Sequence, residues 1–65
     1  MITYNKLFHL MLDRKIKAGD LIRHGISAPT QQRLRNNKPV DTKTIDKLCK
    51  ALQCQPGDIM EYKEG

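Results

Sequence analysis

Two neighbouring side chains, Gln32 and Arg33, have the chemistry needed to recognise a planar, hydrogen-bonding partner. Arg carries a rigid fork of N–H donors, and the Gln amide carries both a donor and an acceptor, so each can form paired hydrogen bonds with the edge of a nucleobase. Ala28 and Pro29 stand a turn earlier and are short enough to let the backbone approach such a partner. Gln and Arg are also good helix formers, and a plain solvated face explains them equally well.

No other set of residues indicates catalysis or metal binding. His9 and His24 have no nucleophile or carboxylate at a spacing that would pair with them, and we interpret both as solvated or packing residues. Cys49 and Cys54 lack the close CxxC spacing of a metal site. The sequence therefore predicts no enzyme, no catalytic residue, no metal, no cofactor and no small-molecule effector.

The segment from about 18 to 35 would position Gln32 and Arg33. An apolar-centred stretch over about 18–24 predicts a short helix, and Gly25 can supply the left-handed backbone that ends it. Ser27 then stands in N-cap position for a helix over about 28–35, with Pro29 tolerated in its first turn. Two short helices joined by a tight turn are typical of a helix-turn-helix.

A first helix is predicted over about residues 3 to 15, with Thr3 as its cap. Its core-facing stripe consists of apolar residues at helical spacing, namely Tyr4, Leu7, Phe8, Met11 and Leu12. Leu10 lies off this stripe and Ile2 lies before the helix, so both are either candidates for an oligomer contact or scattered surface residues.

The remaining elements follow the helix-turn-helix. Asp41 or Thr42 caps a fourth helix, which has apolar residues at helical spacing as far as Leu52. Pro56 opens a last short helix, which carries Ile59 and Met60. No strand is predicted. The fold class is therefore all-α, a compact five-helix bundle that forms a single domain over residues 1–65.

Length and charge narrow the function. A chain of 65 residues is too short for two domains or a large-pocket enzyme. Twelve Lys and Arg against seven Asp and Glu give a net charge of +5, which points to a polyanionic partner. Residues 1–50 hold eleven basic and four acidic residues, net +7, whereas residues 51–65 hold one basic and three acidic residues, net −2. Two cysteines and the absence of a long apolar run predict a reducing cytoplasm and no membrane span.

Basic and amide side chains flank the predicted helix-turn-helix and could contact phosphates. They are Lys17, Arg35, Asn36, Asn37, Lys38 and Lys43. These surroundings favour a nucleic acid as the partner of Gln32 and Arg33 over a merely solvated face.

The chain resembles the Cro and lambda-repressor-like (XRE-type) helix-turn-helix regulators, in particular their short single-domain members. The resemblance covers nearly the whole chain and is carried by Tyr4-Asn5-Lys6-Leu7, by Gly25-Ile26-Ser27, by residues 33–40 and by residues 49–62. The Leu-Cys-Lys-Ala-Leu run followed by Pro-Gly-Asp-Ile-Met is the more specific part. Leu21 stands where the family usually has a small residue, and Gln31 where it usually has a branched apolar one.

The resemblance implies a lambda-repressor-like bundle whose third helix enters the major groove. The base-reading positions match Ala28, Pro29, Gln32 and Arg33. The positions near the DNA backbone match Lys17, Ala18, Thr30, Asn36, Asn37 and Lys38. Such proteins usually bind as homodimers to paired half-sites, so a palindromic double-stranded DNA operator is expected. The predicted function is a sequence-specific transcriptional regulator of bacterial, phage or mobile-element origin. A repressor is favoured, because a lone DNA-binding domain has no sensing or polymerase-recruiting module.

Two other functions fit the same fold. A protein-interaction module, such as an antitoxin or an anti-repressor, would use the apolar residues Ile2, Leu10, Met60 and Tyr62 as its contact. RNA binding driven by charge alone is the weaker alternative, because single-stranded recognition uses exposed aromatic residues and Tyr4 and Phe8 are predicted in the core.

Overall fold

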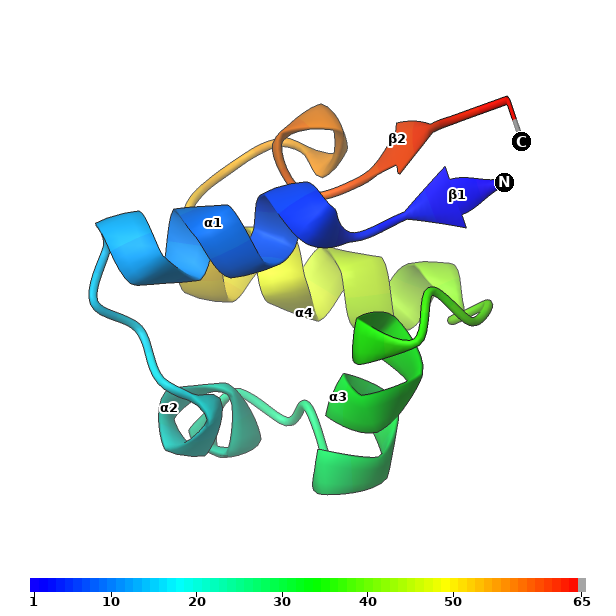
Figure 1. Ribbon diagram of the computed structural model, residues 1–65. Coiled ribbons are helices and arrows are strands. Elements are labelled where there is room, and N and C mark those ends of the chain that lie inside the picture. The colour runs from blue at the N-terminus through cyan, green and yellow to red at the C-terminus, as the bar shows by residue number, and fades with distance from the viewer. Residues whose placement is uncertain (65) are drawn as a thin grey trace.

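The computed structural model describes residues 1–64 and consists mainly of helices around one apolar core (Figure 1). The α-helices are α1 (Asn5–Asp13), α2 (Ala18–Arg23), α3 (Ala28–Arg35) and α4 (Thr42–Leu52). A 3-10 turn, η1 (Pro56–Asp58), follows α4. The short strands β1 (Ile2–Thr3) and β2 (Glu61–Tyr62) pair antiparallel, with Ile2 opposite Tyr62 and Thr3 opposite Glu61. Figure 1 shows α1 lying along α4, with α2 and α3 on one side of this pair and η1 on the other.

The predicted all-α class is correct for most of the chain, but the five-helix count is not confirmed and the absence of strands is wrong. The last predicted helix is a single 3-10 turn, and Ile59 and Met60 lie beyond it. The chain then extends and pairs with the N-terminal residues, whose partners are about sixty positions away in sequence. Strands of two residues carry no periodic signal, so only the return of the chain creates them.

The first helix is shorter than the predicted 3–15, and Thr3 does not cap it. α1 begins at Asn5 with Tyr4 in N-cap position, and no side chain accepts a hydrogen bond there. Thr3 belongs to β1, and its buried hydroxyl has no hydrogen-bond partner. The helix ends at Asp13, and Lys15 then adopts a left-handed backbone with φ 57°. The pairing with β2 therefore holds Thr3 in an extended conformation and delays the start of the helix.

The core gathers residues from α1, the helix-turn-helix, α4 and Ile59. Its buried hydrophobic members are Tyr4, Leu7, Met11, Leu21, Ile26, Leu34, Leu48, Leu52 and Ile59. The predicted stripe of α1 is correct except for Leu12, which is 77% exposed. Leu10, predicted off the stripe, packs against the core instead. The reason is that η1 contacts α1 and covers its Leu10 side, so the buried face is rotated away from Leu12.

The caps of the later helices form as predicted. The Ser27 hydroxyl accepts a hydrogen bond from the Thr30 amide at the start of α3. The Asp41 carboxylate accepts bonds from the amide and the hydroxyl of Thr44 at the start of α4. These bonds, with the side-chain bond from the hydroxyl as the larger cause, lower the pKa of Asp41 below its ordinary value. Gly25 has φ 87°, in the left-handed region that allows the steep turn between α2 and α3.

Candidate nucleic-acid interface

Helix α3 has one buried side and one solvent-facing side. Leu34 and Gln31 face the core, and Ile26 of the preceding turn is buried beside them. The four predicted base-reading residues, Ala28, Pro29, Gln32 and Arg33, are all exposed. The Cα atoms of Ala28 and Pro29 lie in the first turn, where no large side chain keeps a partner away from the backbone. The helix therefore offers the small-then-long order of side chains that a groove-binding helix needs.

Gln31 fastens this helix to the one before it. Its side-chain nitrogen donates to the carbonyl of Ala18 at 3.1 Å and to that of Ile26 at 3.0 Å. The residue is only 5% exposed, so both bonds form in a largely dry setting. One amide thus ties the first residue of α2, the turn and α3 together. The sequence marked Gln31 as unusual for an apolar position but did not reveal this role, because Ala18 and Ile26 are brought to it only by the fold.

Arg33 lies against the loop that follows its own helix. Its guanidinium donates from Nε at 3.1 Å and from Nη2 at 2.8 Å to the carbonyl oxygen of Pro39. It lines a shallow hollow with Thr30, Val40 and Asp41, on the side of α3 that faces the start of α4. Gln32 has no such partner among the described hydrogen bonds, and its side chain is exposed. Gln32 and Arg33 therefore differ, since only the Arg33 side chain is hydrogen-bonded to another described residue.

Arg35 occupies the opposite flank of α3. Its guanidinium carbon lies 5.2 Å from the centre of the Phe8 ring on α1, within cation–π range. Lys17 lines the same apolar hollow, which is formed by Phe8, Met11, Leu12 and Ile16. Lys17 also precedes α2 in N-cap position, and its amide donates to the Asp20 carboxylate. Lys17, Ala18 and Arg35 thus line one hollow between α1, α2 and α3.

The remaining residues predicted to contact phosphates lie in three places: Asn36, Asn37 and Lys38 follow α3, Lys43 is in α4 and Thr30 is in α3. Asn36 and Lys38 are exposed, whereas Asn37 is half-buried with a left-handed φ of 54°. The Asn37 side-chain oxygen accepts a hydrogen bond from the Tyr4 amide at 2.9 Å, so its carboxamide is partly engaged in holding the N-terminal segment. Lys43 is exposed in the first turn of α4. Thr30 is half-buried, and its hydroxyl is bonded to Ser27.

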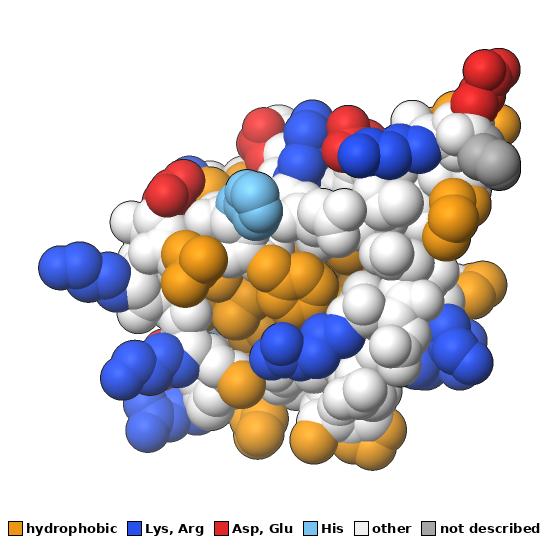
Figure 2. Space-filling model, viewed as in Figure 1, with side chains coloured by type: hydrophobic (Ala, Val, Ile, Leu, Met, Phe, Trp, Pro, Cys, Tyr) orange, Lys and Arg blue, Asp and Glu red, His pale blue; other side chains and the backbone are white. Residues whose placement is uncertain are grey.

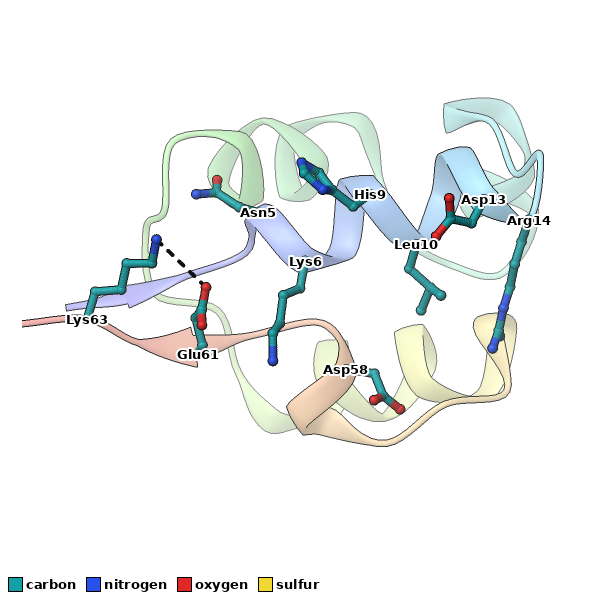
Figure 3. A pocket seen from close by; sticks show the side chains of 9 residues that line it. All are labelled: Asn5, Lys6, His9, Leu10, Asp13, Arg14, Asp58, Glu61 and Lys63. Carbon is teal, nitrogen blue, oxygen red and sulfur yellow. Dashed lines mark ion pairs between the residues drawn. The ribbon is translucent and has the colours of Figure 1, made fainter.

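Charge is divided between the two ends of the molecule. In Figure 2, Lys and Arg predominate on the half that holds α2 and α3, while most of the Asp and Glu in view lie over α1 and the C-terminal segment. A cavity of about 640 Å³ lies between α1 and the C-terminal segment and is lined by both charge signs (Figure 3). Three of its cations have partners: Lys6 bonds to the Gly57 carbonyl, Arg14 to the Gln53 carbonyl at 3.4 Å, and Lys63 lies 3.9 Å from Glu61. The basic end near α3 is therefore the surface suited to a polyanion.

The residues predicted for a protein-interaction surface differ in their exposure to solvent. Ile2 and Tyr62 form an exposed cross-strand pair, 40% and 69% accessible. Leu10 and Met60 are half-buried and pack against the core. Within residues 1–64, no group of three or more His, Cys, Asp or Glu residues is placed to hold a metal ion.

Both the sequence and the fold are similar to those of known proteins. Residues 6–65 match the model of the Cro/C1-type HTH DNA-binding domain, which is nearly the whole chain. The chain belongs to this family. The chain is 39% identical over 57 residues to YozG of Bacillus subtilis (strain 168), an uncharacterised HTH-type transcriptional regulator. The matched region covers 83% of this chain and 68% of the relative. It also superposes on the crystal structure of the transcriptional regulator VanUg with a TM-score of 0.84 and 38% identity, covering 92% of this chain and 81% of the other.

The predicted family is thus confirmed, and with it a helix-turn-helix domain that binds DNA and serves transcriptional regulation. The Bacillus relative agrees with the expected bacterial origin. In the described part of this Cro/C1-type chain, no helix has the length and apolar character needed to cross a membrane.

Proposed function

We propose that this protein is a sequence-specific repressor that binds double-stranded DNA with α3 in the major groove. The observation that carries the proposal is the solvent-facing side of α3, where Ala28, Pro29, Gln32 and Arg33 are exposed together. Repression follows from occupancy, because a small domain bound over a promoter blocks access of the polymerase. A two-fold homodimer on a palindromic operator supplies the second α3 helix for the neighbouring half-site.

In this proposal, base recognition starts from Gln32. Its exposed carboxamide can form paired hydrogen bonds with an adenine edge. Arg33 reads an adjacent base after exchanging the Pro39 carbonyl for a guanine edge. Ala28 and Pro29 allow close approach and contribute apolar contact.

Phosphate contacts surround α3 on both flanks. The proposed residues are Lys17, Ala18, Thr30, Arg35, Asn36, Asn37, Lys38 and Lys43. Asn36 and Lys38 are the most available, since both are exposed at the end of α3. Arg35 stays above Phe8 while its charge faces the duplex, so the aromatic ring limits the entropy that the guanidinium loses on binding.

The test is a selection of bound sequences from a random duplex pool, followed by affinity measurements on the selected site. A palindromic consensus is expected. Gln32→Ala should weaken binding and abolish preference at one position in each half-site, at a cost of about 1–3 kcal/mol. Lys38→Ala should weaken all sequences alike and reduce the salt dependence by roughly one phosphate per subunit.

Lys63→Ala is the matched control, because it also removes one positive charge but lies on the acidic side of the molecule, near Glu61. It should leave the consensus unchanged and alter affinity little. An empty selection, or equal effects of Lys38→Ala and Lys63→Ala, would contradict the proposal. An empty selection together with salt-independent capture of a protein would favour the interaction module instead.

A further inference from the structure

Strand β1 leaves one edge of the small sheet free. The backbone groups of Met1 and Lys63 bond to each other in both directions, the Lys63 amide donating to the Met1 carbonyl at 2.8 Å and the Met1 nitrogen donating to the Lys63 carbonyl. In an antiparallel ladder, such a pair is followed by one whose N–H and C=O groups point away from the partner strand. Ile2 and Tyr62 are that next pair. The donor and the acceptor of Ile2 therefore point to the outer side of β1.

The Tyr4 amide supports this direction independently. It lies two residues after Ile2 and so points to the same side of the chain, where it donates to the Asn37 side chain at 2.9 Å. The α3–α4 loop thus closes the edge at Tyr4. On this edge of β1, only the backbone N–H and C=O of Ile2 are left without a hydrogen-bond partner among the described residues.

An apolar groove of about 400 Å³ adjoins this edge. It is lined by Met1, Ile2, Tyr4, Asn37, Lys38, Pro39, Val40, Thr42, Ile45 and Met60. Lys38 carries the one charged side chain in that lining, and Met1 carries the N-terminal ammonium group. Met1 is 59% exposed and Ile2 40% exposed, so the groove presents apolar surface to solvent beside unpaired backbone groups.

We propose that a second copy of this chain covers the groove by pairing β1 with β1 about a two-fold axis through Ile2. Ile2 and Ile2 of the partner subunit would then exchange both backbone hydrogen bonds, which makes the contact self-complementary. The result is a four-stranded sheet, β2-β1-β1-β2, that covers Met1 and the apolar groove of both copies. A longer foreign peptide fits less well, because continuing along the edge requires the Tyr4 amide that Asn37 occupies.

The same geometry suits paired half-sites, and this step rests on the proposed function. Asn37 and Lys38 line the groove and also belong to the proposed phosphate contacts. Pairing at β1 therefore sets the two α3–α4 loops beside the dimer axis, with one α3 helix on each side of it. The interface and the DNA surface are contiguous, so DNA binding and pairing strengthen each other.

The experiment is sedimentation equilibrium of the full chain without DNA over a range of concentrations. The wild type should approach twice the 7.5 kDa mass of one chain. Ile2→Pro removes the outward amide but no bond to β2, since the Ile2 amide does not take part in that ladder. It should raise the dimer dissociation constant about tenfold or more, because two symmetric donors are lost at once.

Tyr62→Pro is the matched control, since it removes the equivalent outward amide from the other edge of the sheet. It should leave the dimer mass unchanged. Amide hydrogen exchange of Ile2 in the wild type gives a readout without mutation, and its protection should rise with protein concentration.

A wild type that stays monomeric at all concentrations, or a dimer lost with Tyr62→Pro but kept with Ile2→Pro, would overturn the proposal. An Ile2 amide whose exchange ignores concentration would do the same. Because mass and exchange are measured without DNA, the interface can stand even if the selection of operator sequences fails. Conversely, a monomer that still selects a half-site would refute the proposed interface but support the proposed DNA recognition.

Discussion

Replacing Gln31 with glutamate tests whether its buried amide sets the relation between α2 and α3. The wild-type side chain donates hydrogen bonds to the carbonyls of Ala18 and Ile26 at 3.1 and 3.0 Å. Gln31→Glu keeps the shape but turns the donor into an acceptor, so a carboxylate faces two carbonyl oxygens in a site that is 5% exposed. Gln31→Met is the control, because it removes both bonds without adding a charge.

The magnitudes follow from the bonds that are lost. Two hydrogen bonds at about 0.5–1.5 kcal/mol each give about 1–3 kcal/mol for Gln31→Met, less what the apolar chain regains by burial. Gln31→Glu adds an uncompensated buried charge and should cost about 3–5 kcal/mol at neutral pH. Small domains are stabilised by only about 5–15 kcal/mol in all, so the variant should be close to unfolding.

The pH dependence has a definite sign. Burial and two facing carbonyl oxygens should raise the pKa of the introduced carboxyl above that of the unfolded chain. Stability is then greatest below the unfolded-state pKa of about 4.3 and is lost as the pH rises through the folded-state pKa. Lowering the pH should therefore bring Gln31→Glu back toward Gln31→Met, since a protonated carboxyl can donate one bond.

The measurement is urea denaturation followed by circular dichroism at neutral and mildly acidic pH, with affinity for the selected DNA site as a second readout. Equal midpoints for wild type and Gln31→Glu, or a gap between the two variants that does not change with pH, would refute the reasoning. Both variants should also weaken DNA binding, because the angle between α2 and α3 is no longer fixed by the amide.

Three further outcomes are expected. Gly25→Ala should lower the free energy of unfolding in urea by about 1–2 kcal/mol, because φ is 87° at Gly25. Gly19→Ala, with no atom within 4 Å of the new Cβ, should instead stabilise α2 by roughly 0.5–1 kcal/mol. Similar changes in the unfolding free energy of both variants would be inconsistent with left-handed strain at Gly25. Because the pKa of Asp41 is lowered, its contribution to stability is complete above the unfolded-state pKa and is lost as the pH falls through the folded-state pKa. The urea midpoints of wild type and Asp41→Asn should therefore converge in acid. A gap between the two midpoints that stays constant with pH would contradict this role of Asp41. Burial and, as the smaller cause, the neighbouring Cys49 thiol raise the pKa of Cys54 to about 11. Alkylation of Cys54 by iodoacetamide at about pH 8.5, measured by peptide mass mapping, should therefore be slow in the folded protein and fast in urea. Fast labelling of Cys54 in the folded chain would contradict this prediction.

Local patterns were sufficient for the elements whose signals lie within a few residues. Ser27 and Asp41 cap the helices that follow them, Gly25 takes the left-handed conformation, and Leu34 and Ile26 face the core. Each of these depends on hydrogen bonding or burial between near neighbours, which sequence records directly. The family was also recognisable, because its motifs span almost the entire chain.

Contacts between distant residues required the tertiary structure. The strands exist because the chain returns past η1 to pair Tyr62 with Ile2, and the same return buries Leu10 while leaving Leu12 exposed. Arg33 has the composition of a base reader, but only the fold brings the Pro39 carbonyl within its reach.

The sequence by itself determined the helix-turn-helix, the family and the exposed side of α3, since these follow from capping, backbone preference and apolar spacing. The tertiary structure alone decided how α3 is fastened to α2 through Gln31, which of its polar side chains are already engaged, and which sheet edge stays open at Ile2. The physical reason is that hydrogen bonds between residues far apart in the chain form only after the core has fixed the elements in space.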